Sequence, residues 1–279
     1  MLGRSLLMKA SGARLLYPAY VQDYLDRVTA ADVAAGNTLG LELGVTNGFN
    51  TCLQDMVADT SLGISSGVIS EAASKIKAMP FMCGARTLSG CLIPVVGPSP
   101  INFNFVSGDY DRKTGLLGDG STKQLDSNRA GNLDPTNSRH VAVWISTHHT
   151  RDTQRCDIGN TTTAPSRNDT QLLTNTRSRF YRVNSIGDAV VTDASTATGF
   201  WGASRNSASV TVGRFNLVNT DFTNASGPND SSTIHVFSRG GASFSDARLS
   251  FYSIGEFLDL AVLDARISTL MATLASAIP

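Results

Sequence analysis

Glutamate is nearly absent from this chain. It occurs only at Glu42, Glu71 and Glu256, so no glutamate lies between residues 72 and 255. Glycosidases that use two carboxyl groups as nucleophile and acid hold them about 5 to 9 Å apart. A glycosidase built on two glutamates in the middle of the chain is therefore excluded, and only a pair of Asp residues is left for that chemistry.

Charge of either sign is scarce. The 279 residues include 23 Lys and Arg against 23 Asp and Glu, and only 16% are charged. This balance excludes a basic surface that wraps nucleic acid, a polybasic membrane anchor and an acidic disordered tail. Ser, Thr and Asn supply 75 residues instead. A neutral polar surface with no net charge favours association, as expected of one part of a larger assembly.

The usual signatures of metal sites, redox sites and hydrolases are missing. The four cysteines show no C-x-x-C spacing, and we expect buried free thiols rather than disulfides, because a chain of this length can build a core unaided. Neither G-x-S-x-G nor H-E-x-x-H occurs. No apolar run approaches the roughly 18 to 20 residues that span a bilayer. We therefore expect no enzyme, no metal, no cofactor and no membrane insertion.

The first 96 residues divide into an arm and a helical segment. Residues 1–22 are too few for a core of their own, and their leucines predict an arm that docks on a neighbouring protein. Residues 23–96 are interpreted as a helical assembly segment, with helical spacing over 23–58 and a short helix over 71–79. Four glycines at intervals of four predict close packing against another helix or another subunit, or a broken helix: Gly36, Gly40, Gly44 and Gly48.

Residues 97–254 change to short runs separated by Gly, Asn, Asp and Ser. The strands that we expect cover residues 102–106, 121–126, 140–146, 178–183, 188–191, 199–204, 209–218, 233–238 and 247–254. No crossover helices separate them, which excludes a parallel α/β topology. The predicted fold class is mainly β: an antiparallel concanavalin A-like β-sandwich, or jelly roll, with an N-terminal helical segment and a C-terminal helix.

Residues 255–279 predict the C-terminal helix. Ser253 and Glu256 have the spacing of a capping box. Apolar residues then follow in a heptad-like stripe: Leu260, Leu263, Ile267, Leu270 and Leu274. This stripe packs either on the chain's own domains or along a symmetry axis. Together with the four glycines, it predicts a homotrimer organised by the helical portions.

Two polar clusters have a structural and a functional interpretation. The segment from Asp109 to Lys123 is rich in Asp and Gly but lacks the order of a calcium-binding loop, which favours a β-turn over a calcium site. His148 and His149 are adjacent, so on a strand they would face opposite sides of a sheet and could not bind one metal. An exposed pair in a loop is the favoured interpretation.

A glycan site needs an aromatic ring beside hydrogen-bonding side chains. The segments TGFWGASRN and TRSRFYR offer both, in Phe200, Trp201, Arg205, Arg179 and Tyr181. The alternative is that Phe200 and Trp201 fill the core, which is the commoner place for an aromatic pair.

Three long segments, 84–146, 198–209 and 244–279, resemble a family of bacteriophage virion proteins, notably from cyanophages. The similarity covers roughly residues 23–279. It implies a concanavalin A-like (LamG-type) jelly roll preceded by a small helical segment, and it supplies no catalytic residues. The stretch before residue 84 is richer in glycine here than in the family.

The resemblance implies a virion structural protein, assembled in the host cytoplasm. We expect a tail fibre or appendage component whose β-sandwich contributes to recognition of a host-surface glycan. Its expected partners are other virion proteins through the arm, further copies of itself, and no nucleic acid. A head decoration or neck protein with a purely bracing role is one alternative, and a glycan-active enzyme that uses Asp residues is another.

Overall fold

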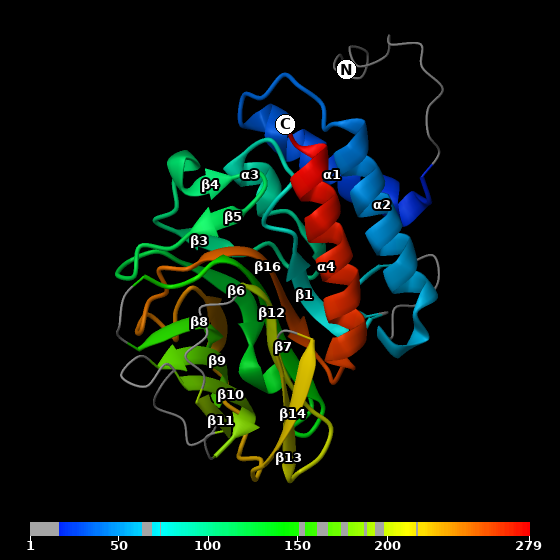
Figure 1. Ribbon diagram of the computed structural model, residues 1–279. Coiled ribbons are helices and arrows are strands. Elements are labelled where there is room, and N and C mark those ends of the chain that lie inside the picture. Colours follow the sequence, from blue (N-terminus) through cyan, green and yellow to red (C-terminus); the bar gives the residue numbers. More distant parts are fainter. Residues whose placement is uncertain are drawn as a thin grey trace.

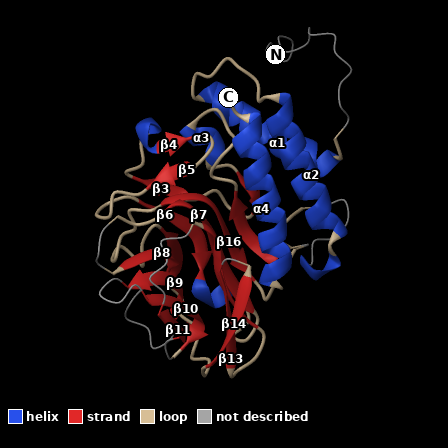
Figure 2. Cartoon of the chain, viewed as in Figure 1, coloured by secondary structure: helices blue, strands red, loops and turns tan. Residues whose placement is uncertain are grey.

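The computed structural model describes residues 17–62, 69–72, 74–150, 154–160, 167–173, 178–186, 189–192, 198–215 and 217–279. Most of the predicted arm therefore lies outside the described residues. The described chain folds into two antiparallel β-sheets and a layer of helices (Figures 1 and 2). The predicted class, a mainly β sandwich with an N-terminal helical segment and a C-terminal helix, is confirmed.

The first sheet has nine strands. Its path runs β14-β13-β12-β7-β16-β1-β2, and β5 joins β16 and pairs in turn with β4. Its strands are β1 (Ile76–Pro80), β2 (Pro94–Val96), β4 (Tyr110–Asp111), β5 (Gly115–Leu117), β7 (Arg139–Thr147), β12 (Gly199–Arg205), β13 (Val210–Phe215), β14 (Val218–Thr223) and β16 (Arg248–Gly255). The centre of this sheet, β12, β7 and β16, consists of strands that are buried almost throughout.

The second sheet has seven strands in the order β11-β10-β9-β8-β15-β6-β3. Its strands are β3 (Ile101–Phe103), β6 (Gln124–Ala130), β8 (Arg155–Gly159), β9 (Arg167–Leu173), β10 (Ser178–Ser185), β11 (Ala189–Thr192) and β15 (Thr233–Val236). It packs against the inner face of the first sheet, where Tyr181 on β10 meets Trp201 on β12 with ring centres 6.2 Å apart.

The helices cover the outer face of the nine-stranded sheet (Figure 1). They are α1 (Ala19–Ala34), α2 (Leu43–Ala58), the short α3 (Leu88–Cys91) and α4 (Leu260–Ala277). Aromatic rings join the layers, because Phe81 stacks on Phe251 of β16 and on Phe49 of α2. A buried ion pair of 2.8 Å between Arg214 on β13 and Asp264 on α4 joins them again.

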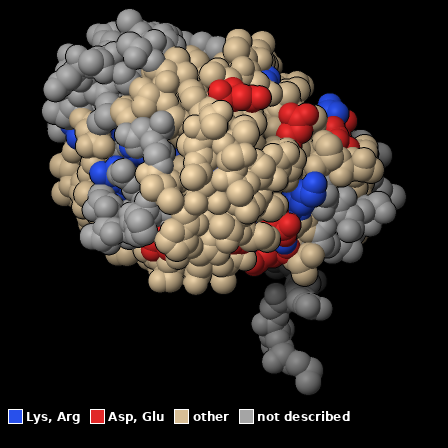
Figure 3. Space-filling model, turned by 90° about the horizontal axis from the view of Figure 1, so that it is seen from below, with Lys and Arg blue, Asp and Glu red and all other residues tan. Residues whose placement is uncertain are grey.

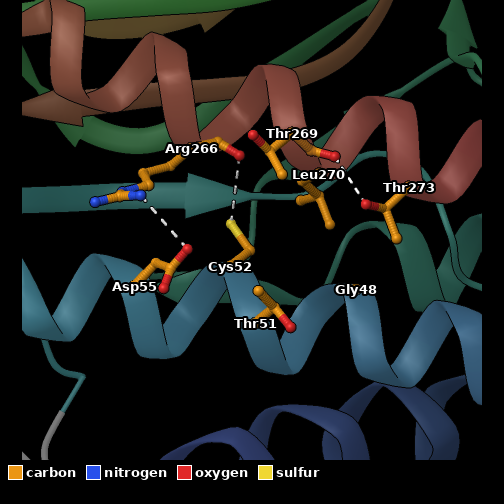
Figure 4. A pocket seen from close by; sticks show the side chains of 8 residues that line it. All are labelled: Gly48, Thr51, Cys52, Asp55, Arg266, Thr269, Leu270 and Thr273. Carbon is orange, nitrogen blue, oxygen red and sulfur yellow. Dashed lines mark hydrogen bonds and ion pairs between the residues drawn. The ribbon is translucent and has the colours of Figure 1, made fainter.

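The apolar stripe of α4 is core of its own chain. All five stripe residues are at most 2% exposed: Leu260, Leu263, Ile267, Leu270 and Leu274. α4 lies along α2, where a Cβ added at Gly44 would be 2.8 Å from Ala277 Cβ, and one at Gly48 would be 3.0 Å from Thr273 Cγ2 (Figure 4). These two glycines therefore permit close packing between helices of one chain.

The predicted seam along a symmetry axis is thus wrong, because its side chains are already buried within one chain. Gly36 and Gly40 do not belong to a helical stripe at all; they lie in the α1–α2 connection with open space around them. The residues that predicted a homotrimer therefore make their contacts within one chain or lie outside the helices.

Several local predictions also need correction. Residues 76–80 form a strand instead of part of a helix, because Ile76 and Met79 pair with β16 and β2. Ser253 is a buried strand residue, and α4 begins later, where the side chain of Asp259 accepts a hydrogen bond of 2.9 Å from the backbone N–H of Ala261. The segment 209–218 contains a turn between β13 and β14. Strands β8 and β9 were not predicted.

The cysteines match their prediction. All four are free and buried: Cys52, Cys83, Cys91 and Cys156. Burial raises the pKa of Cys52 to about 12, so its thiol is protonated and unreactive at neutral pH.

α4 has the length and apolar composition of a helix that could cross a membrane. Core helices of other proteins have the same properties, and here its stripe is buried against α2 and the sheet.

Candidate functional site

The residues predicted to bind a glycan lie in the interior. Phe200, Trp201, Arg205, Arg179 and Tyr181 are each at most 3% exposed. Neighbours on a strand alternate between faces, so Trp201 points between the sheets while Phe200 lies on the helix-covered face, beside Ala142. The two rings cannot share one surface, and the interpretation as a recognition site is wrong. They are core residues, which was the alternative.

Arg179 and Arg205 are buried for structural reasons. The Arg179 guanidinium lies 3.4 Å from the centre of the Phe215 ring and 5.1 Å from that of Trp201. Arg205 donates hydrogen bonds to the carbonyl oxygens of Val183 and Asn224 and to nearby side chains. Burial lowers the pKa of Arg205. A forked side chain with five N–H donors suits this task better than Lys, and the sequence has no Lys after Lys123.

His149 also departs from its prediction. Its side chain is 1% exposed, with Nε2 3.1 Å from Asp157 and Nδ1 3.0 Å from Asp246. Burial alone would lower the pKa of His149, but the two carboxylates outweigh it and raise the pKa to about 9. The imidazolium ties the segment after β7 to β8 and to the segment before β16. No cluster of His, Cys, Asp or Glu suited to a metal occurs among the described residues.

The Asp-rich segment between Asp109 and Lys123 forms turns, as predicted. The Asp119 carboxylate accepts hydrogen bonds from the backbone N–H groups of Ser121, Thr122 and Lys123 at 2.8 to 3.0 Å. Its oxygen atoms therefore hold the chain's own backbone.

A cleft of about 500 Å³ opens where the two sheets meet near the start of α4. Its walls come from both sheets and from the segments beside them. The lining residues are Glu71, Ala72, Lys77, Arg129, Leu133, Pro135 and Glu256. Lys77 lies on β1, Arg129 on β6, and Glu256 directly after β16, so residues far apart in sequence meet here.

Arg129 forms the fixed wall of this cleft. It is 4% exposed and binds Asp134 through two hydrogen bonds, from Nε at 3.1 Å and from Nη2 at 2.6 Å. Its Nη1 lies 2.6 Å from Glu71 Oε1. Burial would lower the pKa of Arg129, but the hydrogen bonds to Asp134 and the charge of Glu71 outweigh it and raise the pKa. Arg129 is thus a permanent cation that holds Glu71 in place.

Lys77 holds the other carboxylate. Its Nζ lies 3.0 Å from Glu256 Oε1 and donates a hydrogen bond of 3.0 Å to the backbone oxygen of Glu71. The backbone of Glu256 is itself fixed, because its N–H donates to Lys75 and its oxygen lies 2.6 Å from Nδ1 of the buried His140. The two glutamates that bound the glutamate-free stretch of the sequence therefore line one cleft.

Both glutamates of the cleft leave part of their side chains exposed. Each glutamate uses Oε1 on a cation, while the side chains remain 49% exposed at Glu71 and 34% exposed at Glu256. The cleft thus offers carboxylate oxygens that accept hydroxyl protons, beside an apolar surface at Leu133, which is 60% exposed.

A second pocket, between α2 and α4, is much smaller. It measures about 20 Å³ and is bordered by Cys52, Asp55 and Arg266 (Figure 4). This space suits about one water molecule and is too small for a sugar or a nucleotide.

Fold and cleft together define the class: an antiparallel two-sheet β-sandwich with a helical layer on one sheet and a charge-paired cleft between the sheets. No protein-family model and no curated protein matches the chain. Among solved structures, it is similar to the botulinum neurotoxin serotype D binding domain (9% identity, TM-score 0.47), with 70% of this chain and 51% of that chain covered.

A second similar structure is Trypanosoma rangeli sialidase in complex with sialic acid. Identity is 10% and the TM-score 0.45, with 82% of this chain and 38% of that chain covered. The chain thus spans about half the length of the toxin domain and less of the sialidase.

Proposed function

We propose that the chain is a structural protein of a bacteriophage virion, part of a tail fibre or appendage, and that its sandwich contributes to recognition of a host-surface glycan. The placement in a virion is supported by the sequence resemblance. The observation that supports glycan recognition is the cleft, in which fixed carboxylates and cations surround an exposed apolar side chain. Hydroxyl groups can donate to Glu71 and Glu256 while the apolar face of a sugar ring lies on Leu133.

The charge pattern favours a neutral or weakly charged ligand. Both cations of the cleft are already paired with its carboxylates, so no single sign dominates. On the face shown in Figure 3, most of the surface of the described residues is uncharged, and on one side positive and negative side chains lie next to one another. Such a surface gives little electrostatic attraction to a polyanion, so affinity must come from hydrogen bonds and apolar contact.

A bracing role in a head or neck is the second candidate. It is favoured by β3, an edge strand that leaves Ile101 47% and Phe103 41% exposed. Open edges with apolar side chains are commonly covered by a neighbouring protein. A protein that only braces its neighbours would bind no glycan.

The first test compares glycan binding by the wild type and by Leu133→Asp. The substitution places an unpaired carboxylate in the cleft without removing a buried contact, so the fold should persist. We expect labelled wild-type protein to bind host envelope polysaccharide and the variant to bind at least about tenfold more weakly, the loss of roughly 1.4 kcal/mol.

The matched control is Val218→Asp, an equally exposed apolar residue on β14, away from the cleft. It should bind like the wild type. Equal binding by Leu133→Asp and the wild type would overturn the role of the cleft. No binding of wild type to any host polysaccharide would overturn glycan recognition and favour the bracing role.

A further inference from the structure

One end of the helical layer is apolar and exposed. Residues at the end of α1, in the connection and at the start of α2 form what we name the apolar cap: Val33, Ala34, Ala35, Leu39 and Leu43. Val33 is 51% exposed, Leu39 63% and Leu43 62%. Large apolar side chains gathered on one surface mark a place where another segment or molecule binds.

The cap has almost no charge of its own. The one acid between residues 33 and 43 is Glu42, which is held by Arg86 at 2.8 Å and by Arg112 at 2.6 Å. The connection is also ordered by hydrogen bonds, since Asn37 donates its backbone N–H to Asp32 and its side-chain amide to Leu39. The apolar side chains are therefore presented by a fixed backbone.

The first described residue, Tyr17, lies beside this cap. Tyr17 donates its hydroxyl hydrogen toward Thr46 Oγ1 at 3.0 Å and Asn47 Oδ1 at 2.9 Å. Thr46 lies three residues after Leu43 on α2, so the two side chains share one side of the helix. Leu15 and Leu16 directly precede Tyr17 in the sequence. Two residues of extended chain span at most about 7 Å, so Leu15 and Leu16 are within chain reach of the surface around Leu43.

We propose that residues 1–16 bind the apolar cap of their own chain, with Leu15 and Leu16 packed on Leu43 and Leu39. Residues 1–16 are favoured over a separate molecule because they are joined to the chain beside the cap. A tethered segment meets its binding surface at a high effective concentration. Leu2, Leu6 and Leu7 supply further apolar residues, and sixteen residues reach up to about 55 Å, far enough to extend over the cap to Val33.

The test is hydrogen exchange of the full-length chain, at a concentration where sedimentation shows a single monomeric species. We compare the wild type with the double variant Leu15→Ser, Leu16→Ser. Amides of residues 33–43 should exchange several-fold faster in the variant, while those of β7 and β16 stay unchanged. The matched control is Arg4→Ser, Lys9→Ser, which changes the same arm without removing leucines and should leave exchange near the wild-type rate.

Unchanged exchange over residues 33–43 in the leucine variant would overturn the proposal. So would protection of the cap that appears only as concentration and molecular mass rise together, because the occupant would then be a second copy. Protection that appears only in assembled particles would assign the cap to another virion protein and would equally overturn it. None of these outcomes bears on glycan binding at the cleft.

Discussion

Buried ionisable side chains set the chemistry of this protein at the scale of single residues. His149 is the clearest case, because its imidazolium lies between Asp157 and Asp246 inside the sandwich. The pKa of His149 is about 9, above its ordinary value near 6.5. Protonated His149 therefore stabilises the folded state fully below about pH 6.5, and this contribution is lost as pH rises toward 9.

The prediction concerns His149→Gln. The variant removes the imidazolium between two buried carboxylates, of which Asp246 keeps a second cation, Arg155 at 3.6 Å. At pH 6 it should therefore lower the free energy of unfolding by a few kcal/mol, since one pKa unit corresponds to about 1.36 kcal/mol. The difference from the wild type should shrink between pH 6.5 and 9, where wild-type His149 loses its proton. Urea unfolding of both proteins across this range measures it.

The variant must be compared with the wild type at each pH, because His140 changes the pH dependence of the stability of both proteins in the opposite direction. Burial lowers the pKa of His140 to about 4, so the wild type and the variant alike lose stability as pH falls from 6.5 to 4. His235→Gln is the matched control, since His235 Nε2 lies 3.8 Å from its nearest carboxylate, on Asp126. A His149 difference that does not change with pH would contradict the imidazolium.

At the scale of elements, the question is whether the apolar stripe of α4 is core of one chain or an interface between several chains. We predict that Ile267→Asp, Leu270→Asp unfolds the protein without changing its stoichiometry, because both side chains are at most 1% exposed within the chain. Even a large-to-small change at such a site costs about 2 to 5 kcal/mol. Sedimentation velocity and thermal unfolding measure the two effects separately.

Ala265→Asp, Ala272→Asp is the control on the exposed side of the same helix, and it should remain folded. A seam variant that stays folded but dissociates from a larger assembly would restore the symmetry-axis interpretation.

The sequence pattern locates strands well where burial follows strand periodicity or a continuous apolar run. Residues 140–146, 199–204 and 247–254 correspond closely to β7, β12 and β16. The apolar pattern does not predict β8, because the buried residues of this strand include the polar Arg155 and Asp157. β1 was interpreted as helical because its partner, β16, lies about 170 residues away in the sequence.

The candidate site could not be predicted by spacing. Glu71, Lys77, Arg129 and Glu256 are spread over 185 positions of the sequence, and only the two-sheet packing brings them together. The predicted site failed for a related reason. An aromatic pair beside Arg has the composition of a sugar site, but the strand carrying Trp201 is central and covered on both faces. Composition identifies chemistry, whereas exposure depends on the complete fold.

At the scale of the whole molecule, the cleft and the apolar cap lie at opposite ends of α4. Glu256 precedes the first turn of α4, while Ala277 at its last turn packs beside Gly44 at the start of α2. An 18-residue helix is about 27 Å long. The cleft and the apolar cap are therefore separate surfaces, and covering one leaves the other free.

The most direct test is a cryo-electron microscopy reconstruction of the purified virion to which the proposal assigns this protein. We predict that density for the sandwich lies in a tail fibre or appendage, with Leu133 and Glu256 facing outward and the helical layer facing the particle. Absence of the protein from the particle, or a cleft covered by a neighbouring virion protein, would contradict the account.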